Sequence, residues 1–390
     1  MTQWNTQRYL KEGRAANVSA AILRNAVKTA AITHAANPRT PPVLSLAHLA
    51  ALTDVPYEFL RSVVSRGGDE EATFYQVFSL KKRDVGHQRN RTRTICAPHP
   101  LLLRAQRWIH ENILKLGRFH ESSCAYRPGS KIIEAAQLHC DARWMVKLDI
   151  TSFFESITEP KIYKVFRMFG YQPLIAFELA RICTRTRRRS PRRKKPPKSF
   201  KIEAYDDKRL GHLPQGAPTS PLLANLVVFG LDVALSKLAE ENGMIYTRYA
   251  DDITLSTSTI AWSRTKAVEL LCEGHDVLRA HGFYPNQAKA NIVPPGGRKV
   301  MLGLAVNDAV PRLTRGFKNK LRAHIFYLRR FLNSGVSPHE KLGFDSILGL
   351  QRHVFGLAYF AKGIEREWGT ERLDELNALS WPTDHGISFD

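Results

Sequence analysis

The stretch that decides the fold is residues 244–255, which read Met-Ile-Tyr-Thr-Arg-Tyr-Ala-Asp-Asp-Ile-Thr-Leu. Apolar and aromatic residues flank two adjacent acids, a pattern typical of two buried strands joined by a tight turn at Ala250-Asp251-Asp252. Upstream, residues 143–150 read Arg-Trp-Met-Val-Lys-Leu-Asp-Ile, which predicts a short strand carrying Asp149 near its end. If these strands are neighbours in one sheet, their three carboxylates project together from rigid elements.

Three carboxylates held in this way have a specific chemical use. Phosphoryl transfer to a hydroxyl can be catalysed by two divalent ions about 4 Å apart, and carboxylate oxygens are the ligands that hold such ions. One of these acids alone would carry little information, because an aspartate at a strand end often only caps a turn. The combination of Asp149 with the Asp251-Asp252 pair indicates a two-metal phosphoryl-transfer site.

Three motifs, in a fixed order, resemble those of the reverse transcriptases. Tyr249-Ala250-Asp251-Asp252 is similar to the active-site motif of that family, and residues 148–154, Leu-Asp-Ile-Thr-Ser-Phe-Phe, resemble the motif with its first metal-binding aspartate. Residues 213–226 resemble the motif that positions template and nucleotide. The resemblance implies an RNA-directed DNA polymerase with an α+β right-hand fold: fingers, thumb, a palm with an antiparallel sheet, and a helical N-terminal extension.

The resemblance also implies the roles of individual residues. Asp149, Asp251 and Asp252 would be catalytic and would hold two Mg²⁺ ions, with Mn²⁺ as an alternative and the Ile150 carbonyl as a further ligand. Phe154 would lie under the incoming sugar and exclude a 2′-hydroxyl, unless Phe153 and Phe154 are both core residues. The other expected nucleotide-binding residues are Lys82, Arg93, Gln215 and Lys289.

The charge of the chain points to a polyanionic partner. There are 58 Lys and Arg residues against 36 Asp and Glu, a net charge of +22, and neutralisation of phosphates dominates nucleic-acid affinity. Residues 185–198 hold nine basic residues, three prolines and no acid. Such a run is either a nucleic-acid contact or a solvated arm. We expect contact through Arg187, Arg188, Arg189, Arg192, Arg193, Lys194 and Lys195.

The chain divides by pattern into three parts. Residues 1–73 predict a helical extension interrupted at 37–42, residues 74–310 fingers and palm with the basic insertion 185–198, and residues 311–390 a basic helical thumb and tail. A hairpin with a basic tip is expected around 81–91, and helices are expected over 101–116 and 160–182. The five cysteines show no metal-ligand spacing and are expected to be reduced and buried. Without an export pattern or a membrane-length apolar run, a cytoplasmic protein is expected.

Within the family, the chain most resembles the retron and related bacterial defence enzymes. Retron enzymes carry Asn-Ala-x-x-His before the first catalytic aspartate. Here residues 135–139 read Ala-Ala-Gln-Leu-His, so the histidine (His139) is kept and the asparagine is not. We expect His139 to be either an RNA contact or a helix-face histidine. Of the retron Val-Thr-Gly element only Gly303 remains.

The implied partners are a noncoding RNA template, the RNA–DNA hybrid, dNTPs and an effector protein in an anti-phage system. Protein-primed or untemplated DNA synthesis, a group II intron-like enzyme, an RNA-directed RNA polymerase and a non-catalytic nucleic-acid binder remain alternatives.

Overall fold

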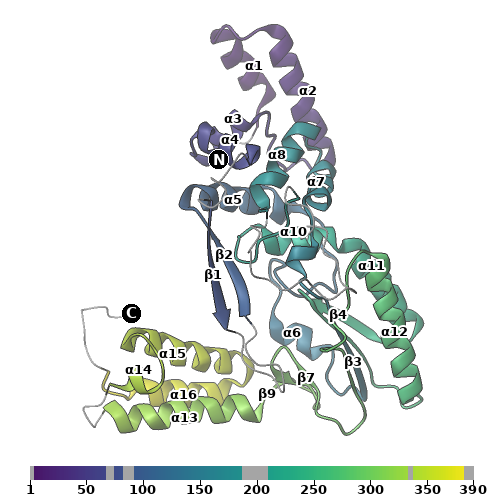
Figure 1. Cartoon of the computed structure of the whole chain (residues 1–390), viewed down its shortest axis with the longest axis vertical. Coiled ribbons are helices and arrows are strands. Elements are labelled where there is room, and N and C mark those ends of the chain that lie inside the picture. The colour runs from purple at the N-terminus through teal and green to yellow at the C-terminus, as the bar shows by residue number, and fades with distance from the viewer. Residues whose placement is uncertain (1–3, 67–73, 82–91, 187–209, 333–336, 382–390) are drawn as a thin grey trace, which may run out of the picture. The chain divides into compact units, whose positions relative to one another are not determined.

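A computed structural model of the chain describes residues 4–66, 74–81, 92–186, 210–332 and 337–381 (Figure 1). Two compact units divide the chain. The first contains residues 1–130, 146–255 and 265–291, and the second residues 131–145, 256–264 and 292–390. The sequence-based boundaries at 73/74 and 310/311 stay predictions. Lys82 and the expected contacts of the basic run, Arg187, Arg188, Arg189, Arg192, Arg193, Lys194 and Lys195, lie outside the described residues.

Four helices open the first unit: α1 (Thr6–Ala15), α2 (Ala20–Ala36), α3 (Leu46–Thr53) and α4 (Tyr57–Ser65). The first three begin with a polar side chain, from Asn5, Ser19 and Ser45, that accepts a hydrogen bond from an amide of the first turn. The interruption expected at 37–42 falls between α2 and α3, as the prolines there require.

The expected hairpin follows, formed by β1 (Tyr75–Lys81) and β2 (Thr92–Pro98). The two strands are antiparallel, with Tyr75 opposite Pro98 and Lys81 opposite Thr92. Helix α5 (Pro100–Asn112) begins two residues after β2 with a proline at its first position, where no amide hydrogen is needed. A short 3₁₀-helix, η2 (Leu114–Leu116), completes the helical stretch expected there.

A four-stranded sheet carries the predicted acids, in the order β4-β5-β3-β6. Its strands are β3 (Trp144–Asp149), β4 (Ile245–Tyr249), β5 (Asp252–Thr257) and β6 (Asn291–Val293). Backbone bonds from Ile150 to Asp251 (3.1 Å) and from Arg143 to Thr257 (2.8 Å) show that β3 and β5 are antiparallel. The sheet that the sequence predicted is therefore present.

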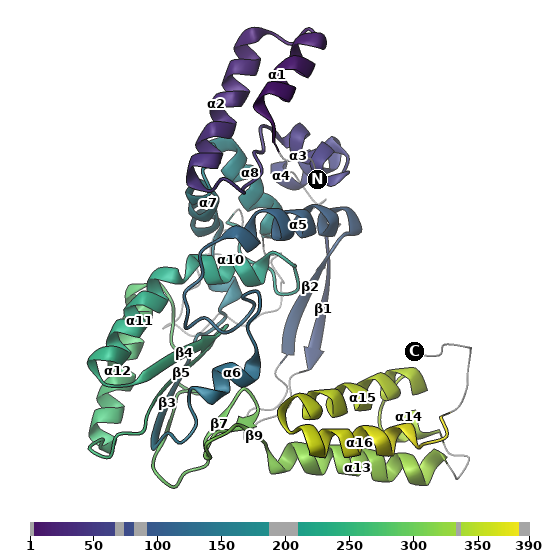
Figure 2. The same cartoon turned by 180° about the vertical axis from the view of Figure 1, so that it is seen from behind.

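Helices pack on this sheet within the first unit. Helices α10 (Ser220–Val227) and α11 (Phe229–Glu241) precede β4, and α12 (Arg264–Ala280) follows β5 (Figure 2). Gly274 of α12 lies so close to Leu148 that a Cβ there would be 2.8 Å from the leucine side chain. The helix predicted over 160–182 is instead two helices, α7 (Glu159–Met168) and α8 (Pro173–Cys183). Gly170, at φ +83°, and Pro173 end the first helix and start the second.

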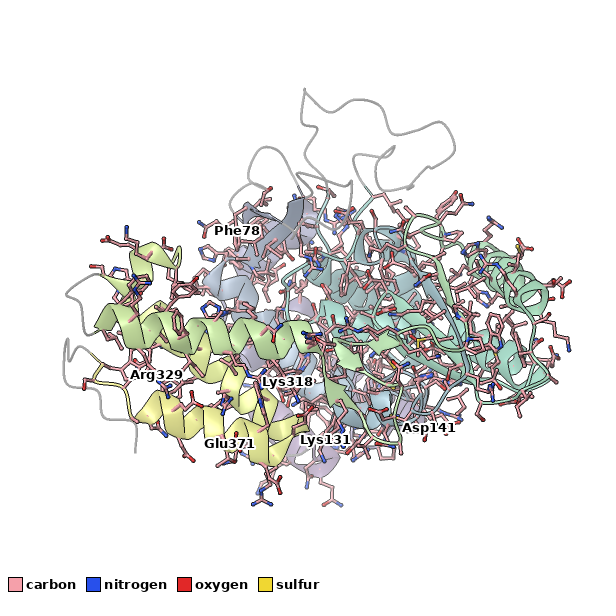
Figure 3. All side chains as sticks on the ribbon, turned by 90° about the horizontal axis from the view of Figure 1, so that it is seen from below. Phe78, Lys131, Asp141, Lys318, Arg329 and Glu371 are labelled. Carbon is pink, nitrogen blue, oxygen red and sulfur yellow. The ribbon has the colours of Figure 1, made fainter. Side chains whose placement is uncertain are left out.

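The second unit contains helix α6 (Ile132–Gln137), a short antiparallel sheet and a helical bundle. The sheet consists of β7 (Val300–Met301), β8 (Leu304–Ala305) and β9 (Arg312–Leu313). Helix α13 (Arg315–Leu332) then buries Leu321, Ile325 and Leu328, as the periodicity predicted. It is followed by α14 (Pro338–Lys341), α15 (Ile347–Ile364) and α16 (Arg366–Asn377). Lys318 and Arg329 of α13, labelled in Figure 3, pair with Glu365 at 2.5 Å and Glu375 at 3.1 Å.

His139 matches neither of the two expectations, because it lies in the turn that follows α6 rather than on a helix face. It is fully buried in the second unit, and its Nδ1 lies 2.6 Å from the Ser256 hydroxyl. In the described structure it is therefore a core residue rather than a surface available to RNA. The cysteine prediction was partly wrong: all five are free thiols, but Cys272 is exposed and Cys140 half-buried.

Among the described residues, no single helix is long and apolar enough to cross a membrane. Helices α10 and α11 reach that length and composition only when taken together, and they are bent by 55° at their junction.

Candidate active site

The turn between β4 and β5 brings the acids to one edge of the sheet. Ala250 and Asp251 form the turn, Asp252 is the first residue of β5, and Ala250 adopts a left-handed conformation with φ +56°. The adjacent β3 ends at Asp149, and the Ile150 amide donates to the Asp251 carbonyl at 3.1 Å. The structure thus brings Asp149, Ile150, Asp251 and Asp252 together.

Asp149 is buried and already neutralised by neighbours. Its Oδ1 accepts a hydrogen bond from Asn286 Nδ2 at 2.8 Å, and its Oδ2 lies 2.5 Å from Lys289 Nζ. The Asn286 amide also donates to the Asp149 carbonyl at 2.7 Å. Lys289, expected to bind the nucleotide, therefore pairs with Asp149. Asn286 contacts the same carboxylate and was not among the expected site residues.

The two acids of the β4–β5 turn, Asp251 and Asp252, both have raised pKa values. Burial and the charge of Asp149 raise the pKa of Asp251. Burial also raises the pKa of Asp252, and Lys147, whose Nζ lies 3.4 Å from Asp252 Oδ2, opposes that rise only in part. The edge of the sheet therefore carries more negative charge than its own lysines offset, which favours a bound cation.

The chemistry of these groups fits magnesium. In the part of the chain that the structure describes, no three acidic, histidine or cysteine side chains, the three site aspartates included, are placed so that they could hold a metal ion by themselves. Mg²⁺ does not require such a group of three, because it is usually held by one or two carboxylates together with water and substrate phosphates. An open edge with oxygen donors is therefore compatible with the expected ions.

A buried arginine, Arg248 of β4, donates a hydrogen bond to the backbone of the β4–β5 turn. Its side chain is fully buried, and every N–H group of the guanidinium has an acceptor. Burial alone would lower the pKa of Arg248, but the hydrogen bonds and charge of Asp232 raise it. The acceptors are both Asp232 oxygens (2.7 Å each) and, at 3.1 Å each, Asn225 Oδ1, Ser123 Oγ and the Ala250 carbonyl. The catalytic turn is thereby tied to α10, α11 and the 122–124 segment.

The loop before α10 packs against the β1–β2 hairpin. The Cys96 amide of β2 donates to the Gln215 carbonyl at 2.7 Å. Gly216 follows with φ +118°, and a Cβ on it would lie 2.9 Å from the Cys96 carbonyl oxygen. Only glycine fits both the conformation and the approach, so Gly216 fixes where Gln215 lies.

We expect Gly216→Ala to destabilise the protein by about 1–3 kcal/mol, because the alanine must strain its backbone or displace β2. Nucleotide incorporation should fall as well. Urea unfolding and an incorporation assay would measure the two effects. Gly230→Ala is the matched control, because nothing lies within 4 Å of its Cβ position inside α11. Equal stability of Gly216→Ala and wild type would contradict the packing argument.

The remaining predicted residues lie in different environments. Phe153 is buried beside Phe283 (ring centroids 6.1 Å apart), whereas Phe154 is only half-buried. The two rings therefore do not both belong to the core. Arg93 is exposed on β2. Tyr126, absent from the predicted site, lies 6.1 Å from the Tyr249 ring, and its pKa is raised by burial and then by Tyr249 and Asp251, while Arg93 opposes the rise.

A sheet edge with three acids, together with a glycine-containing loop that packs on a β-hairpin, is typical of a palm-type nucleic-acid polymerase. The family model described as reverse transcriptase (RNA-dependent DNA polymerase) matches residues 80–306. The chain therefore belongs to the reverse transcriptase family, an RNA-directed DNA polymerase family whose members generally use divalent metal ions and nucleic-acid templates.

The curated relatives include several retron enzymes. The chain is 28% identical to the Retron Ec86 reverse transcriptase of Escherichia coli, over 86% of this chain and 94% of that protein. It is 31% identical to the Retron Ec83 reverse transcriptase of the same species, over 79% and 91%. The Retron Mx162 reverse transcriptase of Myxococcus xanthus is 29% identical over 76% of this chain and 62% of that protein.

Among solved structures, telomerase from Candida albicans is similar at a TM-score of 0.40 and 11% identity, over 77% of this chain and 56% of that chain. Similarity this low adds nothing to the family assignment.

Proposed function

We propose that this reverse transcriptase copies a noncoding RNA into DNA in a retron-like defence system, and that the acids at the β3 and β4–β5 edge are its active site. The observation that carries the proposal is the cluster of Asp149, Asp251 and Asp252. Burial and mutual repulsion disfavour the ionised carboxylates of Asp251 and Asp252, and bound cations would stabilise them. The retron relatives support the choice of RNA template. We place the activity in the cytoplasm, where transcripts and dNTPs are available.

Each acid has a proposed part. Asp149 and Asp251 would hold two Mg²⁺ ions, or Mn²⁺ in their place, with Asp252 and the Ile150 carbonyl as auxiliary ligands. Ions so bound lower the pKa of the primer hydroxyl and neutralise charge on the triphosphate. Lys289 Nζ lies beside Asp149, and it would stabilise the negative charge that develops on the pyrophosphate.

The nucleotide and the template would be held by residues around this edge. Gln215, fixed by Cys96 and Gly216, would contact the nascent base pair. Arg93, with Lys82, would meet the triphosphate. The basic run would contact the RNA–DNA hybrid through its phosphates, with Arg187, Arg188, Arg189, Arg192, Arg193, Lys194 and Lys195 as the contact residues. An effector protein completes the proposed defence system.

We propose that the half-buried ring of Phe154 lies under the incoming sugar, where it would clash with a 2′-hydroxyl and so select deoxyribose. Phe154→Val should raise ribonucleotide incorporation relative to deoxyribonucleotide by about tenfold or more. Single-nucleotide incorporation with matched dNTP and rNTP measures the ratio. Phe153→Leu is the control, since that core ring should affect stability and leave the ratio unchanged. An unaltered ratio in Phe154→Val would remove the basis for this role.

The proposed template is tested by purifying the protein from its host with its native nucleic acid, beside an Asp251→Ala, Asp252→Ala double variant. DNA joined to RNA in the wild type and absent from the variant would support the retron-like function. RNA alone in both would contradict it and favour a binding role. DNA joined to a serine or tyrosine of the protein would instead show protein priming.

A further inference from the structure

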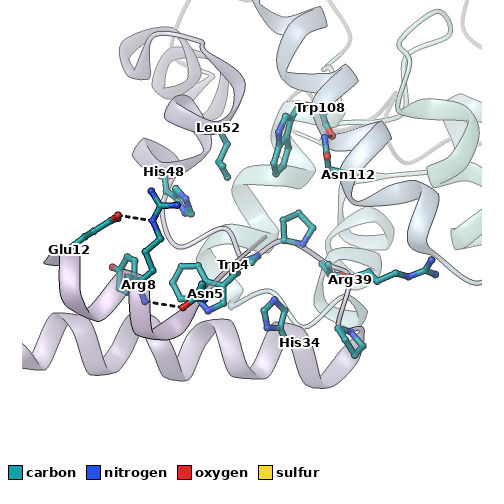
Figure 4. A pocket seen from close by; sticks show the side chains of 15 residues that line it. Trp4, Asn5, Arg8, Glu12, His34, Arg39, His48, Leu52, Trp108 and Asn112 are labelled. Carbon is teal, nitrogen blue, oxygen red and sulfur yellow. Dashed lines mark hydrogen bonds and ion pairs between the residues drawn. The ribbon is translucent and has the colours of Figure 1, made fainter. Parts of the chain in front are cut away.

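A cavity of about 610 Å³ lies among the N-terminal helices of the first unit (Figure 4). Helices α1, α2, α3 and α5 and the 37–42 segment supply its walls. None of the residues proposed above for polymerisation lines it. The proposed reaction therefore does not account for this cavity. Its walls are rich in rings, including those of Trp4, Tyr9, His34, Pro41, His48 and Trp108.

Three neutral hydrogen-bond donors belong to this lining. Thr40 Oγ1 and Trp108 Nε1 are buried and have no hydrogen-bond partner among the described residues. The Leu44 amide donates to His48 Nδ1 at 3.2 Å, which leaves the N–H of that ring at Nε2. Burial lowers the pKa of His48, which favours the neutral form of this half-buried ring. Buried donors without partners, as Thr40 Oγ1 and Trp108 Nε1 are here, are unusual in a folded protein, and they fit a ligand with acceptor atoms.

The charges around the cavity select against a cationic ligand. Glu12 is the one carboxylate in the lining, and Arg8 pairs with it at 2.7 Å. Arg39 is exposed at the edge of the cavity (Figure 4), and no carboxylate of the described residues pairs with it. The lining thus offers planar apolar surfaces and neutral donors inside, with an available guanidinium at the rim.

We propose that this cavity binds an unpaired nucleobase, with Arg39 meeting its phosphate. Aromatic rings stack on bases of any sequence, neutral donors match the ring nitrogens and carbonyl oxygens of base edges, and a guanidinium matches a phosphate. The base belongs to a single-stranded segment of the RNA partner or to a free nucleotide. The proposal rests on the nucleic-acid partner of the proposed function, although its test does not depend on polymerisation.

The test uses the full-length protein and a short unstructured oligoribonucleotide carrying 4-thiouridine at successive positions. After irradiation, mass spectrometry locates the crosslinked peptides, with and without nucleoside 5′-monophosphates as competitors. The variants are Thr40→Val and Arg39→Gln. Arg24→Gln, an exposed cation of α2 outside the cavity, controls for charge. Thr53→Val controls for loss of a buried hydroxyl, because Thr53 Oγ1 already donates to the Leu49 carbonyl at 2.8 Å.

We expect crosslinks on peptides that contain Trp4, Tyr9 or Trp108, weakened about tenfold by Thr40→Val and Arg39→Gln and unchanged in both controls. Thr40→Val should leave the free protein at least as stable as wild type, whereas Thr53→Val should lower its melting temperature. Extension of a supplied primer should be unaffected in all four variants, so failure here is distinguishable from failure of the polymerase assignment.

Competition by monophosphates would identify a free-nucleotide site, and its absence would identify the RNA strand. Crosslinks confined to other parts of the chain would overturn the proposal. Crosslinks at the cavity that Thr40→Val and Arg39→Gln leave unchanged would also overturn it.

Discussion

Asp251→Asn should fold normally and lose polymerase activity by about a thousandfold or more. The substitution keeps the shape of the side chain but removes a charge that the proposed ions need, and such ions supply several kcal/mol of transition-state stabilisation. Steady-state primer extension measures the loss. Asp276→Asn is the matched control, because that exposed carboxylate of α12 pairs with its helix neighbour Arg279, at 2.6 Å, and its loss should leave activity unchanged.

The stability of Asp251→Asn separates lost chemistry from lost folding. Burial and the charge of Asp149 raise the pKa of Asp251 in the folded protein. The folded state therefore binds more protons than the unfolded state between the ordinary and the raised pKa, and stability falls as pH rises through that window. Without metal at neutral pH, Asp251→Asn should be at least as stable as wild type. A lower melting temperature would attribute the lost activity to misfolding.

Arg248→Met should destabilise the fold by about 3–5 kcal/mol, because it leaves the buried Asp232 carboxylate without a counter-charge. A triple variant, Tyr246→Phe, Asp232→Leu and Arg248→Met, removes the ion pair together with the Tyr246 hydroxyl that donates to Asp232 at 2.6 Å. Buried ion pairs are often replaced by apolar residues at little cost, so the triple variant should recover most of the lost stability.

Activity should not recover with it. Without Arg248, the Ala250 carbonyl loses its hydrogen bond and the catalytic turn is no longer tied to α10 and α11. Small misplacements of catalytic groups cost about a hundredfold in rate. Denaturant unfolding measures the stability and kcat the activity, both on the same preparations of the triple variant. Full activity in a stable triple variant would mean that the network only fills the core.

The sequence predicted the acid-bearing part of the fold because its information there is local. Alternating apolar residues around Asp251-Asp252 and before Asp149 require buried strands, and the structure contains them. The break between α7 and α8 at 169–172 was missed, although Gly170 and Pro173 are local signals for it. Strands β7–β9 span only two residues each and are too short to leave a pattern.

The contacts that organise the site could not be predicted from the sequence, because the residues that form them are distant from each other along the chain. Lys289 and Asn286 reach Asp149 across about 140 residues, and Arg248 reaches Ser123 across 125. One signal was available: a charged residue within an otherwise apolar strand requires a buried partner, which would have marked Arg248 without identifying Asp232. The pairing of Cys96 with Gln215 had no local signal.

The most direct test of the central claim is extension of a DNA primer annealed to an RNA template, with purified protein, Mg²⁺ and either dNTPs or rNTPs. The account predicts a DNA product that reaches the end of the template with dNTPs, little product with rNTPs, and none from Asp251→Asn. Extension with rNTPs alone, or bound template without any extension by the wild-type protein, would contradict it.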